Sequence, residues 1–227
     1  MAELALPPLP PDQFDRLERC FPSRPVALAA GGQVSVRECG AAPADVLPLV
    51  CLHGIGSGAA SWLEAALILS QRTRVIAWDA PGYGASTPLP MDAPRGADYA
   101  QRLHDLLDTL GISRCVLVGH SLGALMAAPA VRQAPERFAA LVLVSPAQGY
   151  GAPARALERA RVHAERLQAL AADGIAGMAE RRSQRLLSEH ASTTDRKSVV
   201  EGKSVDLGGR RIIKKKKPER FATLVLL

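Results

Sequence analysis

Three features of this 227-residue sequence predict an α/β fold built on a mostly parallel sheet. Short, almost wholly apolar runs alternate with segments of helical periodicity. The apolar runs are bounded by glycine- and proline-rich turn signals. Near the middle of the chain, two glycines flank a serine where such a run meets a helical segment. Strands that alternate with helices form parallel sheets joined by right-handed crossovers, and this length allows one sizeable core.

The expected elements follow one another in a regular order. Residues 34–38 alternate apolar and polar side chains, as a half-buried strand near a sheet edge does. Strands buried on both faces are expected at 47–52, 74–78, 115–118 and 139–144, with helices at 59–69, 97–110 and 122–133. Gly111 is a stop signal for the second helix. Pro129 lies inside the third helix, where a kink is expected because proline costs ~3 kcal/mol there.

The character of the chain changes after Pro146. Two amphipathic helices, at 154–172 and 175–187, follow each other with no strand between them. We expect residues 1–147 to form the core of the fold and residues 148–194 to form part of a helical cap over the sheet.

The net charge of +6 arises from one segment, residues 195–217, with nine Lys or Arg and three Asp or Glu. All six lysines of the chain lie there, whereas the first 194 residues use arginine alone. The segment resembles a translated sequencing-adapter oligonucleotide, and we interpret it as foreign and disordered. The alternative is a basic tail for nucleic acid or anionic lipid. The lysine discontinuity favours the foreign origin, so no nucleic-acid partner is expected.

A short repeat supports this interpretation. Residues 218–227 match residues 135–144 at eight of ten positions. A solenoid needs at least about three stackable copies, so the second copy is interpreted as a duplicated strand fragment from a sibling sequence. The fold is therefore predicted to be incomplete at the C-terminus and fused to the foreign segment.

Cysteine spacing and hydropathy exclude several classes of protein. Cys20, Cys39, Cys51 and Cys115 show no metal-ligand spacing, and the last two lie in apolar runs, where a reduced thiol is a small hydrophobe. No apolar run reaches the roughly 18 residues of a membrane span, and the N-terminus does not resemble a signal peptide. We expect a cytoplasmic protein without metal, cofactor or membrane partner.

The chemistry is predicted to centre on Ser121. The run Gly119-His120-Ser121-Leu122-Gly123 fits Gly-x-Ser-x-Gly, with a strand before it and a helix after it. A serine on so tight a turn needs small neighbours and presents its hydroxyl above the sheet edge. The Leu122 amide, unpaired at the helix N-terminus, is available to a developing oxyanion.

A second oxyanion donor is expected from the loop after the first buried strand. There His53, Gly54 and Ile55 begin a glycine-rich stretch whose backbone a substrate can approach closely. The Ile55 amide is the candidate donor, with His53, Gly54, Gly119, His120 and Gly123 in supporting positions. The alternative is a glycine-rich turn with no part in chemistry.

Residues 50–56 (VCLHGIG), 79–86 (DAPGYGAS) and 119–123 (GHSLG) together resemble the α/β-hydrolase family. The resemblance implies an eight-stranded, mostly parallel sheet with a helical cap inserted near Ser145. Within the family the chain is similar to small cap-bearing bacterial enzymes: enol-lactonases, carbon–carbon bond hydrolases and carboxylesterases. Serine at position 121 argues against haloalkane dehalogenases and epoxide hydrolases, which use aspartate there.

The resemblance also implies the triad order serine, acid, histidine along the chain. Only His163 and His190 follow Ser121, both in the helical part, so we expect the triad acid and base to be absent. Asp79 is expected to brace a turn, and His104 to be solvated. The resulting hypothesis is a serine hydrolase acting on a small ester, lactone or activated carbon–carbon bond, with little turnover in this chain. An acyltransferase and a non-catalytic binding protein on the same fold are the alternatives.

Overall fold

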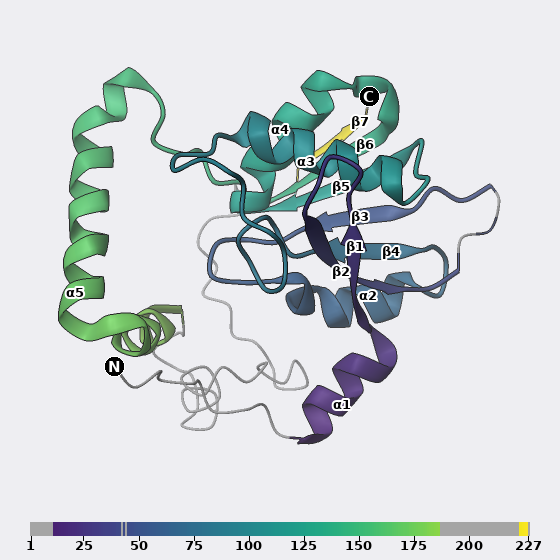
Figure 1. Cartoon of the computed structure of the whole chain (residues 1–227), viewed down its shortest axis with the longest axis horizontal. Helices are drawn as coiled ribbons and strands as arrows, with labels where there is room; N and C mark the ends of the chain where they lie inside the picture. Colours follow the sequence, from purple (N-terminus) through teal and green to yellow (C-terminus); the bar gives the residue numbers. More distant parts are fainter. Residues whose placement is uncertain (1–10, 42, 44, 187–222, 227) are drawn as a thin grey trace. The chain divides into compact units, whose positions relative to one another are not determined.

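The computed structural model describes residues 11–41, 43, 45–186 and 223–226 (Figure 1). These residues group into two compact units. The larger contains residues 14–148 together with 223–226, and the smaller contains residues 149–186 together with 11–13.

The larger unit is built on a seven-stranded sheet with the strand order β1-β2-β4-β3-β5-β6-β7. The strands are β1 (Ser23–Ala27), β2 (Gln33–Cys39), β3 (Leu49–Leu52), β4 (Val75–Trp78), β5 (Cys115–His120), β6 (Phe138–Val144) and β7 (Thr223–Leu226). The four strands β4, β3, β5 and β6 are parallel to one another, and β1 runs in the same direction. Only β2 and β7 are reversed among the described strands, which confirms the mostly parallel sheet.

The helices predicted for this unit agree with the observed ranges to within a few residues, and one further helix, α1, precedes them. The observed helical elements are α1 (Pro11–Cys20), the 3-10 turn η1 (Ala59–Trp62) leading into α2 (Leu63–Leu69), α3 (Gly96–Thr109) and α4 (Leu122–Gln133), with a short turn η2 (Pro135–Arg137) before β6. Two elements, α1 and β1, were not predicted. In β1 Pro25 interrupts the apolar pattern, and proline is tolerated there because β1 is an edge strand.

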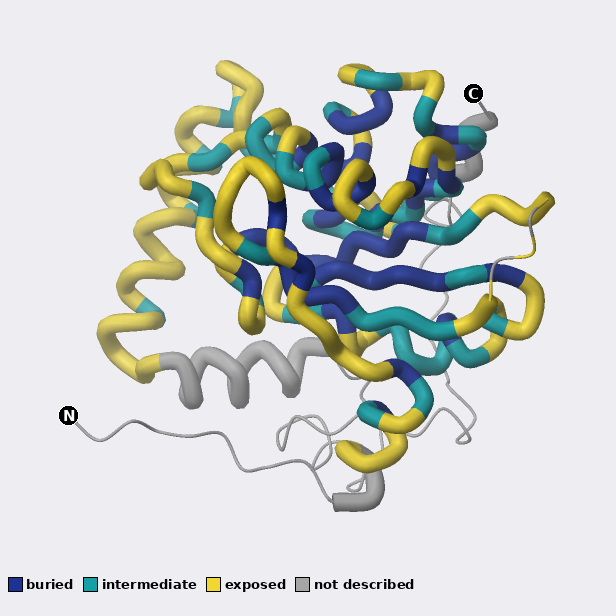
Figure 2. The backbone as a smooth tube through the Cα atoms, turned by 45° about the vertical axis from the view of Figure 1, so that its right-hand side comes forward, coloured by how far each residue is buried: buried dark blue, intermediate teal, exposed yellow. Residues whose placement is uncertain are grey.

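Successive residues of the central strands enter two different apolar clusters. In β4, Ile76 and Trp78 pack with residues of α3 and α4, whereas Val75 and Ala77 pack with Leu17, Phe21 and Ala66 from the α1 and α2 side. Because side chains alternate along a strand, the two clusters cover opposite faces of the sheet. Figure 2 shows the resulting buried strands at the centre of this unit. This two-sided burial explains why these strands were recognisable as continuous apolar runs.

Two predicted core thiols are buried as expected. Cys51 on β3 and Cys115 on β5 are free cysteines with 2% and 0% exposure. Burial raises the pKa of each thiol to about 12, so both are protonated and unreactive at neutral pH.

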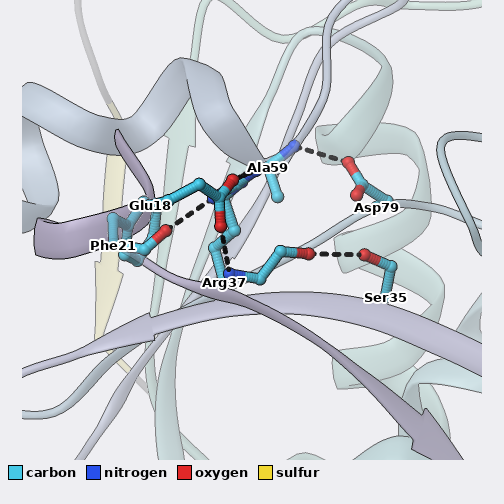
Figure 3. A network of polar contacts seen from close by, with 7 residues as sticks. Glu18, Phe21, Ser35, Arg37, Ala59 and Asp79 are labelled. Atoms are coloured by element: carbon cyan, nitrogen blue, oxygen red, sulfur yellow. Dashed lines mark hydrogen bonds and ion pairs between the residues drawn. The ribbon is translucent and has the colours of Figure 1, made fainter. Parts of the chain in front are cut away.

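A polar network fastens α1 to the sheet (Figure 3). The Arg37 guanidinium on β2 donates to Glu18 Oε1 at 2.6 Å and to the Phe21 carbonyl at 2.7 Å. The hydrogen bond from Arg37 lowers the pKa of the Glu18 carboxyl. Ser23 Oγ and Ser35 Oγ, 3.2 Å apart, add a link between β1 and β2.

The smaller unit carries the helical region predicted after Pro146. Its helix α5 (Ala156–Leu186) follows a 3-10 turn η3 (Pro153–Arg155) and is interrupted at Gly174, where φ is 61° and ψ is −173°. The interruption separates the two predicted helices. Their assignment as a cap over the sheet stays a prediction. Residues 195–217, interpreted as foreign, lie outside the described residues.

Part of the predicted strand fragment belongs to the sheet. Residues 223–226 form β7 and pair antiparallel with β6, with Val225 opposite Leu141 and Thr223 opposite Leu143. Residues 223–226 of the duplicate therefore lie beside the strand that they repeat, at the outer edge of the described sheet.

Helix α4 continues through Pro129 to Gln133. Proline at this position cannot donate to the Leu125 carbonyl one turn earlier. The start of α3 approaches that carbonyl closely, since a Cβ on Gly96 would lie 2.5 Å from the Leu125 oxygen and 3.1 Å from the Pro129 ring. The contact between α3 and α4 at this point therefore requires glycine at position 96.

The expectation that His104 is solvated was wrong. The residue is only 7% exposed and lies on the buried face of α3 with Ala100, Leu103 and Leu107, at the i, i+3, i+4 and i+7 spacing of an amphipathic helix. Its ring centroid lies 5.9 Å from that of Phe138. Neither ring nitrogen makes a hydrogen bond of good geometry, although the Ala130 backbone lies near the ring.

Burial lowers the pKa of His104 below its ordinary value of 6.5, and the nearby Arg137 charge lowers the pKa further. The backbone of Ala130 and the carboxylates of Asp105 and Asp108 act in the opposite direction without reversing the shift. His104 is therefore neutral in the folded state at pH values where it is already protonated in the unfolded chain.

This buried histidine predicts a loss of stability in acid. With the folded pKa below the unfolded one, the contribution is fully present above about pH 6.5 and falls as the pH drops below that value. Replacing His104 by leucine removes the group, so the free energy of unfolding of H104L should depend less on pH. Urea denaturation of both proteins from pH 8 to pH 5 measures the difference, and equal slopes would contradict the assignment.

Candidate active site

Ser121 occupies a strained turn between β5 and α4. Its φ is 52° and its ψ is −108°, so it is one of only two non-glycine residues with positive φ among the described residues. Three hydrogen bonds hold its backbone. Its amide donates to the Val144 carbonyl at 3.0 Å, and its carbonyl accepts from the amides of Ala124 and Ala147, each at 3.1 Å. Surrounding structure thus maintains the conformation despite its cost.

The two glycines of the motif are required by close packing. A Cβ on Gly123 would lie 2.3 Å from the Leu52 carbonyl oxygen, at the end of β3. A Cβ on Gly119 would lie 2.8 Å from the Cα of Ala124. Gly123 is therefore required for the turn to pack against the end of β3, and Gly119 is required for β5 to pass close to the first turn of α4.

The loop after β3 lies beside this turn, as predicted. A Cβ on Gly54 would lie 3.2 Å from Ser121 Cβ and 3.0 Å from His120 Nδ1. The two segments meet because β3 and β5 are parallel neighbours, with Leu52 opposite Gly119, so that their carboxyl ends share one edge of the sheet.

The two amides predicted to bind an oxyanion are both available. In the part of the chain that the structure describes, neither the Ile55 amide nor the Leu122 amide donates a hydrogen bond to another group. Ile55 is 40% exposed, and Ser121 is half-buried. The roles of Ile55 and Leu122 as oxyanion donors stay predictions.

His53 is buried beneath the same loop, with 1% exposure. Its Nδ1 lies 2.8 Å from the Gly54 carbonyl oxygen, and its Nε2 accepts a hydrogen bond from the Ala80 amide at 3.0 Å. Its ring packs edge-on against Tyr83, with centroids 4.7 Å apart. Burial lowers the pKa of His53, so the ring is neutral at neutral pH.

Asp79 braces the loop that follows Ile55. Its Oδ1 accepts a hydrogen bond from the Ala59 amide at 2.7 Å, as Figure 3 shows. Glycines surround the carboxylate: a Cβ on Gly58 would lie 2.9 Å from Oδ1, and one on Gly84 would lie 2.8 Å from Oδ2. The side chain therefore connects the loops after β3 and β4, which agrees with the structural role expected for it.

No histidine of residues 14–148 is arranged as a general base for Ser121. Both nitrogens of His53 are engaged, His104 lies in the core, and His120 shows no hydrogen bond to the serine. His163 is an exposed residue of α5, and His190 lies outside the described residues. Within the described residues there is also no cluster of three or more histidine, cysteine or acidic side chains suited to a metal ion.

The sequence profile of the α/β hydrolase fold matches residues 48–224, which is most of the chain. The match includes both glycine-flanked loops and the turn at Ser121. This chain belongs to the α/β-hydrolase fold family.

Curated members of the family are similar over part of their length. A (lyso)-N-acylphosphatidylethanolamine lipase of Mus musculus is 31% identical over 152 residues, 65% of this chain and 43% of the relative. A 2-hydroxy-6-oxo-6-phenylhexa-2,4-dienoate hydrolase of Comamonas testosteroni is 36% identical over 108 residues, 46% of this chain and 37% of the relative. The chain thus matches less than half the length of these curated relatives.

Solved structures show the same fold. A hydrolase from Pseudomonas aeruginosa superimposes with a TM-score of 0.62 at 24% identity, over 81% of this chain and 67% of that one. A protein from Salmonella enterica, described as a proposed acyltransferase, is 31% identical with a TM-score of 0.50, over 55% of this chain and 42% of that one. No helix among the described residues is long and apolar enough to cross a membrane.

The Gly123 contact predicts a large effect from one methyl group. In G123A the new Cβ would collide with the backbone at Leu52, so the free energy of unfolding should fall by about 1–3 kcal/mol or more. Urea denaturation measures it. G151A is the matched control, because a Cβ at position 151 meets no atom within 4 Å. Equal unfolding midpoints for the two variants would contradict the packing described here.

Proposed function

We propose that this chain is a serine hydrolase in which Ser121 is the nucleophile. The strained turn at Ser121, held by three backbone hydrogen bonds beside the Gly54 loop, is the observation that carries the proposal. Strain of this kind places a hydroxyl above the edge of a sheet and keeps it away from the helix that follows. Membership of a family rich in hydrolases supports the same reaction class.

In the proposed reaction the Ser121 oxygen attacks the substrate carbonyl carbon, gives up its proton to water, and forms a tetrahedral oxyanion. The free amides of Ile55 and Leu122 would donate to that oxygen, since each belongs to one of the two adjoining loops. Collapse of the oxyanion expels the leaving group and leaves an acyl-serine, which water then hydrolyses.

The substrate class that we propose is a small ester, a lactone or an activated carbon–carbon bond. All three contain a carbonyl carbon that serine can attack and a leaving group that departs as an oxygen or stabilised carbon anion. The similar mouse and Comamonas proteins are named as a lipase and a dienoate hydrolase, which fits this range of acyl substrates.

Labelling with a fluorophosphonate tests the nucleophile directly. The serine oxygen forms a bond to phosphorus and fluoride leaves, so peptide mass spectrometry should find the adduct on Ser121. The S121A variant should give no adduct there. S145A is the matched control, because Ser145 also has positive φ, 44°, at the end of the neighbouring strand β6. Labelling of Ser145 instead, or of neither serine, would refute the proposed nucleophile.

We further propose that turnover by this chain is slow, because no histidine among residues 14–148, the described part of the chain around Ser121, is arranged as its general base. A serine hydroxyl is a weak nucleophile without one. Added imidazole should therefore raise the rate of labelling in proportion to its concentration, while H163A and H190A should leave the basal rate unchanged. A stopped assay with mass detection measures the rates. Loss of labelling in H163A or H190A would instead identify that histidine as the base.

An acyltransferase is the second candidate function. The similarity to the proposed acyltransferase from Salmonella enterica supports it, since the same acyl-serine would form first. The two reactions differ in the acceptor. When an acyl donor ester is supplied with both water and a competing alcohol, a hydrolase releases mostly free acid and an acyltransferase mostly the new ester.

A further inference from the structure

The hydrogen bonds of His53 determine which of its nitrogens carries the proton. The Ala80 backbone amide can only donate, so Nε2, 3.0 Å away, must be the unprotonated acceptor. In a neutral imidazole the proton then lies on Nδ1. The Gly54 carbonyl oxygen, 2.8 Å from Nδ1, can only accept, so this second bond requires the same tautomer. Both contacts are therefore satisfied by one protonation state alone.

The bond from Nδ1 also fixes the direction of an amide. The Gly54 carbonyl and the Ile55 N–H belong to the same peptide unit, which is trans, as are all peptide bonds among the described residues. In a trans peptide the C=O and N–H bonds point in opposite directions. Because His53 holds the carbonyl oxygen inside the protein, the Ile55 N–H must point away from the His53 ring.

Few other groups are placed to form hydrogen bonds with the His53 ring. His53 is 1% exposed, so water has little access to its ring. Tyr83 packs edge-on against the ring, and His120 and Asp79 are the nearby ionisable groups. Burial is the largest effect and lowers the pKa of His53, although the hydrogen bond to the Gly54 backbone and the Asp79 charge favour the protonated ring; the His120 charge acts with burial.

We propose that His53 is a positioning residue, which aims the Ile55 N–H at the oxyanion through its Nδ1–H bond to the Gly54 carbonyl. The proposal rests on the proposed function of Ser121 and adds a residue that orients one of the two oxyanion donors. A protonated His53 would carry a second N–H on Nε2, facing the N–H of Ala80, and two donors cannot share a hydrogen bond. The loop between β3 and η1 would then shift, and the Ile55 N–H would no longer point toward the oxyanion.

Nitrogen-15 NMR of the full-length chain tests the tautomer without any measurement of activity. Long-range couplings from the ring protons should identify His53 as the neutral form with the proton on Nδ1. As the pH falls below about 6.5, the Ile55 amide resonance should move with the same midpoint as the His53 ring. Finding the proton on Nε2, or an Ile55 signal that does not follow the ring, would overturn the proposal.

Two variants test the two hydrogen bonds of His53 one at a time. The amide of H53N can replace Nδ1 as donor to Gly54, whereas H53Q can replace Nε2 as acceptor from Ala80. We expect H53N to retain most of the fluorophosphonate labelling rate. H53Q should lose about tenfold, less than the 10²–10³ that removal of an oxyanion donor costs in other enzymes. The Ile55 amide resonance should shift from its wild-type position in H53Q and should not shift in H53N.

The outcomes distinguish the positioning of Ile55 from the identity of the nucleophile. Equal labelling rates in folded H53N and H53Q would overturn the positioning role while leaving Ser121 as the nucleophile. If wild type is not labelled at all, the proposed function fails, and the Ile55 signal in the pH titration still decides whether His53 directs that amide. Should H53Q not fold, judged by circular dichroism, the same titration of wild type decides the question.

Discussion

The close approach of the N-terminal turn of α4 to the end of β3 determines the geometry around Ser121. Gly123 faces the Leu52 carbonyl so closely that no side chain fits between them. This contact brings the turn at Ser121 beside the loop that begins at His53, because Leu52 immediately precedes that histidine. The parallel register of β3 and β5, with Leu52 opposite Gly119, makes both segments end at the same edge of the sheet. The arrangement thus depends on backbone packing and needs no long side chain to hold it.

Much of the fold could be predicted from sequence, for a physical reason. The strands β3, β4 and β5 contribute residues to apolar clusters on both faces of the sheet, so each appears as a continuous apolar run. Two elements were missed: β1 is an edge strand that contains a proline, and α1 shows only a short apolar spacing through Phe14 and Leu17. The reversed direction of β7 also had no signal in its sequence, since a nearly identical run of residues forms a parallel strand in β6.

The candidate site was predictable where its parts depend on local chain geometry and unpredictable where they depend on neighbours in space. The meeting of the Gly54 and Ser121 loops follows from parallel strands. The partners of His53 do not, because Ala80 reaches it only through the pairing of β3 with β4. His104 was misjudged for a similar reason: its polarity suggested solvent, whereas its position on the helix places it in the core. Polarity alone is therefore a poor guide to where a histidine lies in this fold.

The placement of β7 has a consequence for how the chain is made. Strand β6 ends at Val144 and β7 begins at Thr223, so 78 residues (145–222) are synthesised between the strand and its neighbour. During that interval the backbone donors and acceptors on the outer side of β6 lack the partner that β7 later supplies. Open strand edges are templates on which other chains pair and aggregate. The nascent chain is consequently more exposed to aggregation than the finished one, and slower synthesis would prolong the period of risk.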